Sequence, residues 1–167
     1  DTMKNKSHSI ESAGLGIVAA AALMARAMAQ EPLKIGLILP YSGQFADTAT
    51  QMDNGIKLYM QKHGDTVAGR KIEIIRKDTG GVAPDVAKRL AQELVVRDGV
   101  DILAGFVLTP NAIAASDVSM QAKKFMVIMN AATSIVTTKS DYSVRVSVTL
   151  PQVCETFGMW AAKNGTK

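Results

Sequence analysis

Segments with the pattern of buried strands alternate with segments patterned as helices from Leu33 to Thr133, and this alternation most constrains the fold. Strands that alternate with helices are joined by right-handed crossovers and form a parallel sheet. In such an open sheet, ligands bind outside the carboxyl ends of the strands. Small polar residues follow three of the predicted strands. The sequence therefore indicates one edge of one sheet as the place for a site.

The fold class that we expect is α/β, with a doubly wound parallel sheet. The predicted strands are 33–39, 71–77, 101–106 and 125–129, and the segment 142–147 alternates as a fifth strand would. The predicted helices are 48–63, 84–98, 110–123 and 149–163. Met52, Ile56 and Met60 would form the apolar stripe of the first helix, and Ile72, Ile74 and Ile75 are expected to be buried.

The first 29 residues have the pattern of a secretory signal peptide. Lys4 and Lys6 precede an apolar stretch over 14–25, and small residues at 27–29 (Ala-Met-Ala) suit cleavage before Gln30. The apolar stretch is shorter than the roughly 20 residues that a membrane-spanning helix needs. We therefore expect 1–29 to be removed on export and 30–167 to form one ligand-binding α/β lobe.

The composition argues against several classes of protein. Cys154 is the single cysteine, so an exported chain would have no internal disulfide, and no Cys/His cluster has metal-ligand spacing. Gly-x-Gly-x-x-Gly and phosphate-loop motifs are absent. The net charge is +4, but the basic residues are scattered, with few aromatic residues among them. We expect no cofactor, no metal and no nucleic-acid partner.

Thr109-Pro110-Asn111 is the first candidate for binding. Thr109 is expected at the N-cap of a helix and Pro110 at its first position. Exposed N–H groups in the first turn, together with the helix dipole, favour an anion such as a ligand carboxylate. The alternative is that Thr109 only caps its own helix.

Two further loops reach the same predicted edge. The segment 130–133 (Asn-Ala-Ala-Thr) has no large side chain, so its backbone groups are open to a ligand, and Thr133 adds a hydroxyl. The segment 41–45 (Tyr-Ser-Gly-Gln-Phe) contains Gly43, which permits a tight turn, and residues from Ser42 to Thr48 could reach that edge. Each loop could equally be an ordinary connection.

Other reactive side chains do not form a catalytic arrangement. Asp98 and Asp101 flank a helix-to-strand turn, where solvated acidic residues are common, and Asp78 lacks an acidic partner. Cys154 has no histidine near in sequence, so we expect a buried structural thiol rather than a nucleophile. The segment 149–163, with Asn164-Gly165 as its C-cap, looks like the start of a new unit. We therefore expect the chain to be the N-terminal part of a longer protein.

A family resemblance runs through most of the chain after the signal peptide. The segments that carry it are 35–43, Asn54-Gly55, 69–75, Asp78, 84–91, 98–105, 130–133 and Arg145. Their order and spacing resemble the periplasmic solute-binding proteins of ABC transporters, in the leucine/isoleucine/valine-binding branch. That resemblance implies two α/β lobes joined by a hinge, with the ligand in the cleft between them and no enzymatic activity. The chain would be the first lobe, with its five strands in the order 2-1-3-4-5.

The resemblance also implies partners and site residues. The protein would lie in the periplasm and deliver a small carboxylate, such as a branched-chain amino acid, to an ABC permease in the inner membrane. The first-lobe residues that hold the carboxylate and ammonium of an amino acid correspond to Thr109, Ala131 and Thr133. Residues of the first loop, Ser42, Phe45 and Thr48, would lie over the ligand. A lobe without its cleft partner would expose apolar surface and be poorly soluble.

Departures from the family pattern leave the ligand class open. Thr48 stands where many members have an aromatic residue, and Pro110-Asn111 replaces a stretch richer in serine and threonine. The small disulfide of some members cannot form with a single cysteine. An aromatic carboxylate would suit Thr109 as well as an amino acid does. The ligand-sensing domain of a signalling receptor is a further alternative, because such receptors use the same fold.

Overall fold

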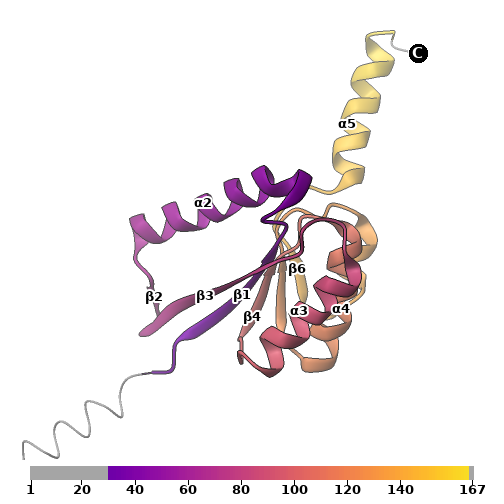
Figure 1. Ribbon diagram of the computed structural model, residues 1–167. Helices are drawn as coiled ribbons and strands as arrows, with labels where there is room; N and C mark the ends of the chain where they lie inside the picture. The colour runs from indigo at the N-terminus through magenta and orange to yellow at the C-terminus, as the bar shows by residue number, and fades with distance from the viewer. Residues whose placement is uncertain (1–29, 166–167) are drawn as a thin grey trace, which may run out of the picture.

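A twisted six-stranded sheet with helices on both faces forms the body of the protein (Figure 1). The computed structural model describes residues 30–165, so the predicted signal peptide lies outside the described residues. The strands are β1 (Leu33–Leu39), β2 (Thr66–Val67), β3 (Arg70–Asp78), β4 (Ile102–Gly105), β5 (Phe125–Ile128) and β6 (Ser143–Arg145). The helices are α2 (Ala46–His63), α3 (Pro84–Val96), α4 (Thr109–Ala122) and α5 (Leu150–Lys163), with 3-10 turns η1 (Gly43–Phe45) and η2 (Ser134–Thr138).

The strand order is β2-β3-β1-β4-β5-β6, and every pair is parallel except β2 with β3. Without the short β2, the other five strands, numbered 1 to 5 along the chain, follow the predicted order 2-1-3-4-5. The sequence analysis missed β2, which is only two residues long. It turns back onto β3 through Ala68 (φ +48°) and Gly69 (φ +80°), and a left-handed alanine gives no turn signal in the sequence.

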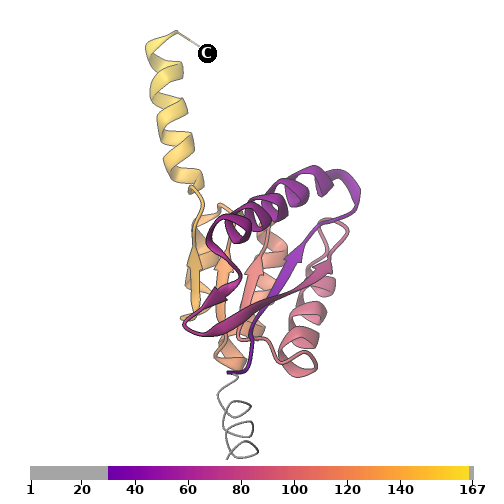
Figure 2. The ribbon, with the colours of Figure 1, turned by 90° about the vertical axis from the view of Figure 1, so that its left-hand side faces the viewer.

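Helices α3 and α4 cover one face of the sheet, and α2 lies over the other (Figures 1 and 2). On the first face, Leu94 of α3 packs directly on β1. A Cβ added to Gly36 would lie 2.7 Å from the Leu94 side chain, so the glycine allows the close approach. Leu103, Met126 and Ile128 complete this core, and Leu37 and Leu39 face the other side with Ala49 of α2.

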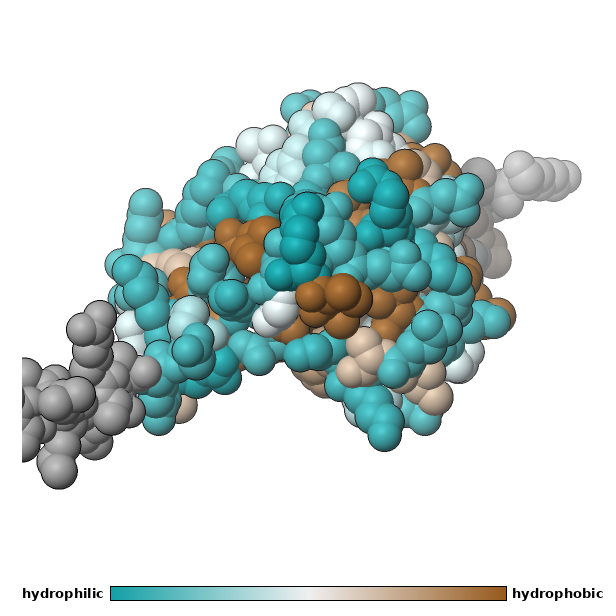
Figure 3. All heavy atoms as spheres, turned by 60° about the horizontal axis from the view of Figure 1, so that its bottom comes forward, coloured by the Kyte–Doolittle hydropathy of each residue, from teal (hydrophilic) through white to brown (hydrophobic). Residues whose placement is uncertain are grey.

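The face under α2 is less completely covered than the sequence pattern predicts. Ile72, Ile74 and Ile75 are half-buried rather than buried; Ile72 and Ile74 line the open space under α2, whereas Ile75 packs against the core on the α3 side. An open apolar groove lies between α2 and the sheet, lined in part by Ile35, Ile56, Ile74, Val127, Met129 and Val146. Figure 3 shows further apolar patches, separated by hydrophilic side chains, on another face.

Helix α5 extends away from the sheet (Figures 1 and 2). Thr149 and Gln152 form a capping box at its start, which explains why the helix begins there. Val153, Phe157 and Trp160 are all at least half exposed. The expectation that Cys154 is buried is wrong, because α5 makes no layer with the sheet and leaves the thiol exposed. No helix within residues 30–165 is long and apolar enough to cross a membrane.

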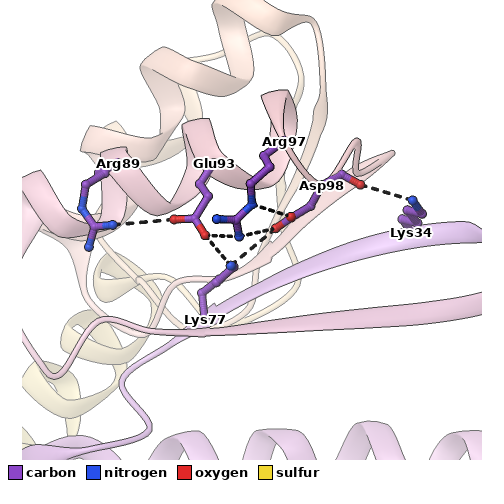
Figure 4. A network of polar contacts seen from close by, with 6 residues as sticks. All are labelled: Lys34, Lys77, Arg89, Glu93, Arg97 and Asp98. Atoms are coloured by element: carbon purple, nitrogen blue, oxygen red, sulfur yellow. Dashed lines mark hydrogen bonds and ion pairs between the residues drawn. The ribbon is translucent and has the colours of Figure 1, made fainter.

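The sequence analysis expected Asp98 and Asp101 to be solvated turn residues, but both carboxylates are paired with cations. Asp98 joins a network at the end of α3 (Figure 4), where Lys77 Nζ lies 2.6 Å from Glu93 Oε1 and 3.4 Å from Asp98 Oδ2. Asp101 Oδ2 accepts hydrogen bonds from Arg70 Nη2 (2.8 Å) and from the backbone N–H of Lys34 (3.1 Å). These contacts fasten α3 and the start of β4 to β1 and β3.

Replacing Asp53 should lower stability in a pH-dependent way. Its buried carboxylate lies 2.9 Å from Arg76 Nε and 2.8 Å from Lys57 Nζ, so it ties α2 to β3. Burial opposes ionisation, but the bonds from Lys57 and Arg76 outweigh it and hold the pKa of Asp53 below its usual 3.8. We expect Asp53→Asn to lower the free energy of unfolding by about 1–3 kcal/mol near neutral pH. This is less than the loss expected for a fully buried ion pair, because both cations are partly exposed.

The sign of the pH dependence follows from that lowered pKa. The contribution of Asp53 is fully present above the pKa of the unfolded state and is lost as the pH falls through the folded-state pKa. Denaturant unfolding from pH 7 to about pH 2 should show the two proteins converging below about pH 4. Asp117→Asn, which breaks the exposed pair with Lys88 (3.0 Å), is the matched control and should cost under about 1 kcal/mol. A pH-independent difference for Asp53→Asn would contradict the assignment.

Candidate functional site

The loops that follow β1, β4 and β5 lie along one edge, because these neighbouring strands are parallel and their carboxyl ends coincide. The β4 loop leads into α4, and the β5 loop is the segment 129–133. The hydroxyl oxygens of Thr109 and Thr133 are 2.9 Å apart, and both side chains are half-buried. Two of the predicted site residues, 24 positions apart in sequence, are therefore in direct contact.

The sequence analysis predicted Thr109 as the N-cap of α4, and this prediction is wrong by one residue. Leu108 takes that position with extended backbone (φ −109°, ψ 134°), and its carbonyl accepts the first helical bond from Ala112 N (3.1 Å). Thr109 is thus the first helical residue, and its hydroxyl bonds Thr133 rather than its own helix. Pro110 has no N–H, so the first-turn donors without a partner within the helix are the N–H groups of Thr109 and Asn111, and these remain available to an anion.

The loop 130–133 is fixed through its backbone. Ala131, which is 2% exposed, donates its N–H to the Phe106 carbonyl at 3.0 Å. The Asn130 side chain donates to the Val107 carbonyl, also at 3.0 Å. The two loops therefore hold one another in place, and the contact between the threonine hydroxyls is one part of a wider connection.

A backbone feature that the sequence did not reveal starts the β4 loop. Gly105 has φ +114° and Phe106 has φ +66°, although Phe106 is a bulky residue and is 1% exposed. Left-handed backbone at such a residue persists only where the surroundings enforce it, and it is concentrated at functional sites. Here the Phe106 N–H bonds Ile38 O (2.9 Å) and its carbonyl accepts from Ala131. The pair Gly105-Phe106 alone gives no sign of this.

The first loop contributes to the same edge by position. Ser42 is exposed, and its N–H lies 3.3 Å from Asp78 Oδ1, while Phe45 and Thr48 are half-buried near the start of α2. Asp78 also accepts from Gly80 N (2.8 Å), so it braces two loops. Burial opposes ionisation of Asp78, but these hydrogen bonds hold its pKa below the ordinary value. Within residues 30–165, no hydrogen bond joins Ser42, Phe45 or Thr48 to the threonine pair.

Two polar residues of the candidate loops have structural roles. Asn111 is 3% exposed; it accepts from Ala83 N (2.9 Å) and donates to Gly81 O (2.8 Å), which secures the loop before α3. Burial, with a contribution from the Asp53 carboxylate, raises the pKa of Tyr41 to about 12, so its phenol stays neutral. The sequence analysis grouped both residues with candidate binding segments, and neither lies in a bond to Thr109 or Thr133.

The arrangement suits binding of an anion. Hydroxyl groups and first-turn N–H groups converge where β4 and β5 end, and both kinds of donor bind carboxylates well. The described part of the chain holds no group of three or more histidine, cysteine or acidic residues that could bind a metal. Both threonines keep part of their surface accessible to solvent at this edge.

Comparison with known proteins places this edge in context. A family model described as "Periplasmic binding protein" matches residues 32–167. A Leu/Ile/Val-binding protein homologue from Brucella abortus is 40% identical over 153 residues, which are 92% of this chain but 39% of the relative. The chain therefore spans well under half the length of this curated relative.

Solved structures of solute-binding proteins also match this chain. A solute-binding protein of an ABC transporter from Rhodopseudomonas palustris BisB5, in complex with 3,4-dihydroxybenzoic acid, is 54% identical with a TM-score of 0.78. The match covers 82% of this chain and 37% of that one. Another R. palustris solute-binding protein, in complex with 4-hydroxybenzoate, is 37% identical with the same TM-score and covers 81% of this chain and 37% of that one.

Proposed function

This chain belongs to the periplasmic binding protein family, and we propose that it is the first lobe of a solute-binding protein that delivers a small carboxylate to an ABC permease in the inner membrane. Members of the family are binding proteins for transport rather than enzymes. In this proposal residues 1–29 direct export and are removed, and residues 30–167 form the lobe in the periplasm. The lobe binds its ligand without changing it chemically.

The observation that carries the proposal is the contact between the Thr109 and Thr133 hydroxyls (2.9 Å) at the start of α4. One of these hydroxyls donates to the other in the free lobe. A carboxylate placed between them would accept from both, and the first-turn N–H groups of α4 would add a favourable dipole. Ala131, whose N–H is already bonded to Phe106 O, would offer the ligand only its carbonyl, and Ser42, Phe45 and Thr48 would border the ligand from the first loop.

A second wall is needed to enclose such a ligand. The site edge is open, α5 leaves the lobe with an exposed apolar face, and the chain matches only 39% of its curated relative. We propose that the remainder of the full-length protein supplies this wall and closes over the ligand. Closure would desolvate the carboxylate and strengthen its hydrogen bonds, since these contacts gain in a low dielectric.

Two ligand classes fit this site. A branched-chain or other amino acid is suggested by the Brucella relative's name, and its ammonium could be held by carbonyl and hydroxyl oxygens of 131–133. An aromatic carboxylate is the second candidate, because the R. palustris protein at 54% identity is in complex with 3,4-dihydroxybenzoic acid. Both classes place a carboxylate at the threonine pair and differ in the rest of the molecule.

Titration of the full-length protein tests the proposal. We expect leucine or 3,4-dihydroxybenzoate to bind with a Kd in the micromolar range or tighter, measured by calorimetry. The methyl ester of the same acid is the matched control; it should bind at least about tenfold more weakly, because it lacks the charge that strengthens these hydrogen bonds. Failure of both acid classes to bind the folded protein would contradict the proposal. Equal affinity for acid and ester would contradict the carboxylate assignment.

A further inference from the structure

Arg145 at the end of β6 donates hydrogen bonds to the backbone of the loop 130–133. Its Nη1 donates to the Thr133 carbonyl at 2.9 Å and lies 3.5 Å from the Ala131 carbonyl. Both contacts come from one nitrogen, whose two N–H groups are fixed in the plane of the guanidinium, whereas a lysine ammonium on a shorter, flexible stem has no such fixed direction. Both contacts are to backbone atoms of the residues proposed to hold the ligand.

The loop depends on such contacts because it has no large side chain to pack. Its other backbone contacts are the Ala131 N–H to Phe106 O (3.0 Å), the Leu150 N–H to Ala132 O (3.0 Å) and the Val136 N–H to Thr133 O (3.2 Å), so Arg145 shares the Thr133 carbonyl with a neutral donor. The first bond ties the loop to β4, and the second ties it to the first residue of α5. Arg145 adds a contact at Thr133, the residue whose hydroxyl contacts that of Thr109.

We propose that Arg145 is a positioning residue for ligand binding, which fixes the Thr133 hydroxyl against Thr109 by holding the carbonyls of Ala131 and Thr133. This inference rests on the proposed function. Without the guanidinium, two carbonyls lose a charged donor and the loop gains freedom at Thr133. The ligand must then order the loop as it binds, which weakens affinity even though Arg145 itself makes no contact with the ligand.

The test compares three variants of the full-length protein with the wild type. Arg145→Met removes charge and donors but keeps a long apolar stem, and Arg145→Lys keeps the charge without the planar fork. Arg89→Met is the matched control, because Arg89 lies on α3, is 65% exposed and reaches Glu93 only at 3.6 Å. Calorimetry measures the affinity for leucine and 3,4-dihydroxybenzoate, and amide hydrogen exchange without ligand measures order in the loop.

We expect Arg145→Met to weaken binding by about 10- to 100-fold, the usual effect of losing a charged hydrogen bond. Arg145→Lys should recover part of that loss, and Arg89→Met should bind within about twofold of wild type. Exchange in Arg145→Met should become faster at the Ala131 and Leu150 amides and stay unchanged at the Phe106 amide, which bonds β1.

Several results would overturn the proposal. Unchanged exchange at Ala131 and Leu150 would show that Arg145 does not position the loop, whatever happens to affinity. Faster exchange at the Phe106 amide as well would indicate general destabilisation instead. Unchanged affinity in Arg145→Met would also reject it. Because exchange is read without ligand, a wild-type protein that binds neither acid would contradict the proposed function and leave the loop measurement to decide the role of Arg145.

Discussion

The Thr109→Val, Thr133→Val double variant of the full-length protein should bind its carboxylate about 100-fold more weakly than the wild type. Valine keeps the branched shape of threonine and removes only the hydroxyl. Each hydroxyl bond to a carboxylate contributes about 1.5–3 kcal/mol, and two bonds at the lower limit, about 3 kcal/mol, correspond to a loss on the order of 100-fold. Both hydroxyls are removed together because they bond each other at 2.9 Å, and a single change would leave the other without its partner.

Calorimetry of wild type and double variant measures this loss, and a melting curve without ligand shows whether the fold is kept. Thr66→Val on β2 is the control for loss of a hydroxyl away from the site, since Thr66 is exposed and bonds only its neighbour Asp65. It should leave affinity unchanged. An unaltered Kd in the double variant would reject the assigned role of Thr109 and Thr133.

Gly105→Ala should destabilise the protein by about 2–6 kcal/mol. An added Cβ would lie 2.2 Å from the Ile38 carbonyl oxygen and 2.9 Å from its carbon. These are backbone atoms of β1, held by the bond from Phe106 N to Ile38 O (2.9 Å), so they cannot move aside cheaply. A φ of +114° adds conformational strain for any residue with a Cβ. Overpacking and backbone strain each cost about 1–3 kcal/mol.

Gly55→Ala is the matched control for this change. Gly55 lies within α2, and nothing is found within 4 Å of its added Cβ. Because alanine favours a helix by up to about 1 kcal/mol over glycine, the control should be neutral or slightly stabilised. Denaturant unfolding of the ligand-free protein compares the two. A Gly105→Ala protein as stable as wild type would show that the β4 loop does not need its left-handed backbone.

The sequence was sufficient to predict the sheet and most helices because the apolar periodicity of these segments matches what they bury. Met52 and Ile56 of the predicted stripe of α2 pack against the core, and the strand order is the one that the family resemblance implied. Errors arose where local pattern and surroundings differ. Cys154 is exposed because α5 forms no layer with another helix or strand among residues 30–165, and β2 turns back through a left-handed Ala68. Neither fact can be read from side-chain hydropathy.

The candidate site was predicted at the level of loops rather than contacts. Thr109 and Thr133 were both identified, because they follow neighbouring parallel strands, and the structure brings their hydroxyls together. Arg145 was noted only as part of the family resemblance. Its bond to the Thr133 carbonyl joins a strand end to a loop 12 residues earlier, and this pairing depends on how β6 adds to the sheet. The left-handed backbone of Phe106 could not be predicted from the sequence.

A crystal structure of the full-length protein with its bound carboxylate tests the central claim most directly. We predict that the carboxylate oxygens lie within hydrogen-bond distance of the Thr109 and Thr133 hydroxyls, at the N-terminus of α4, with the remainder of the protein closed over this edge. A ligand whose carboxylate is held entirely by residues away from the β4 and β5 loops would contradict the account.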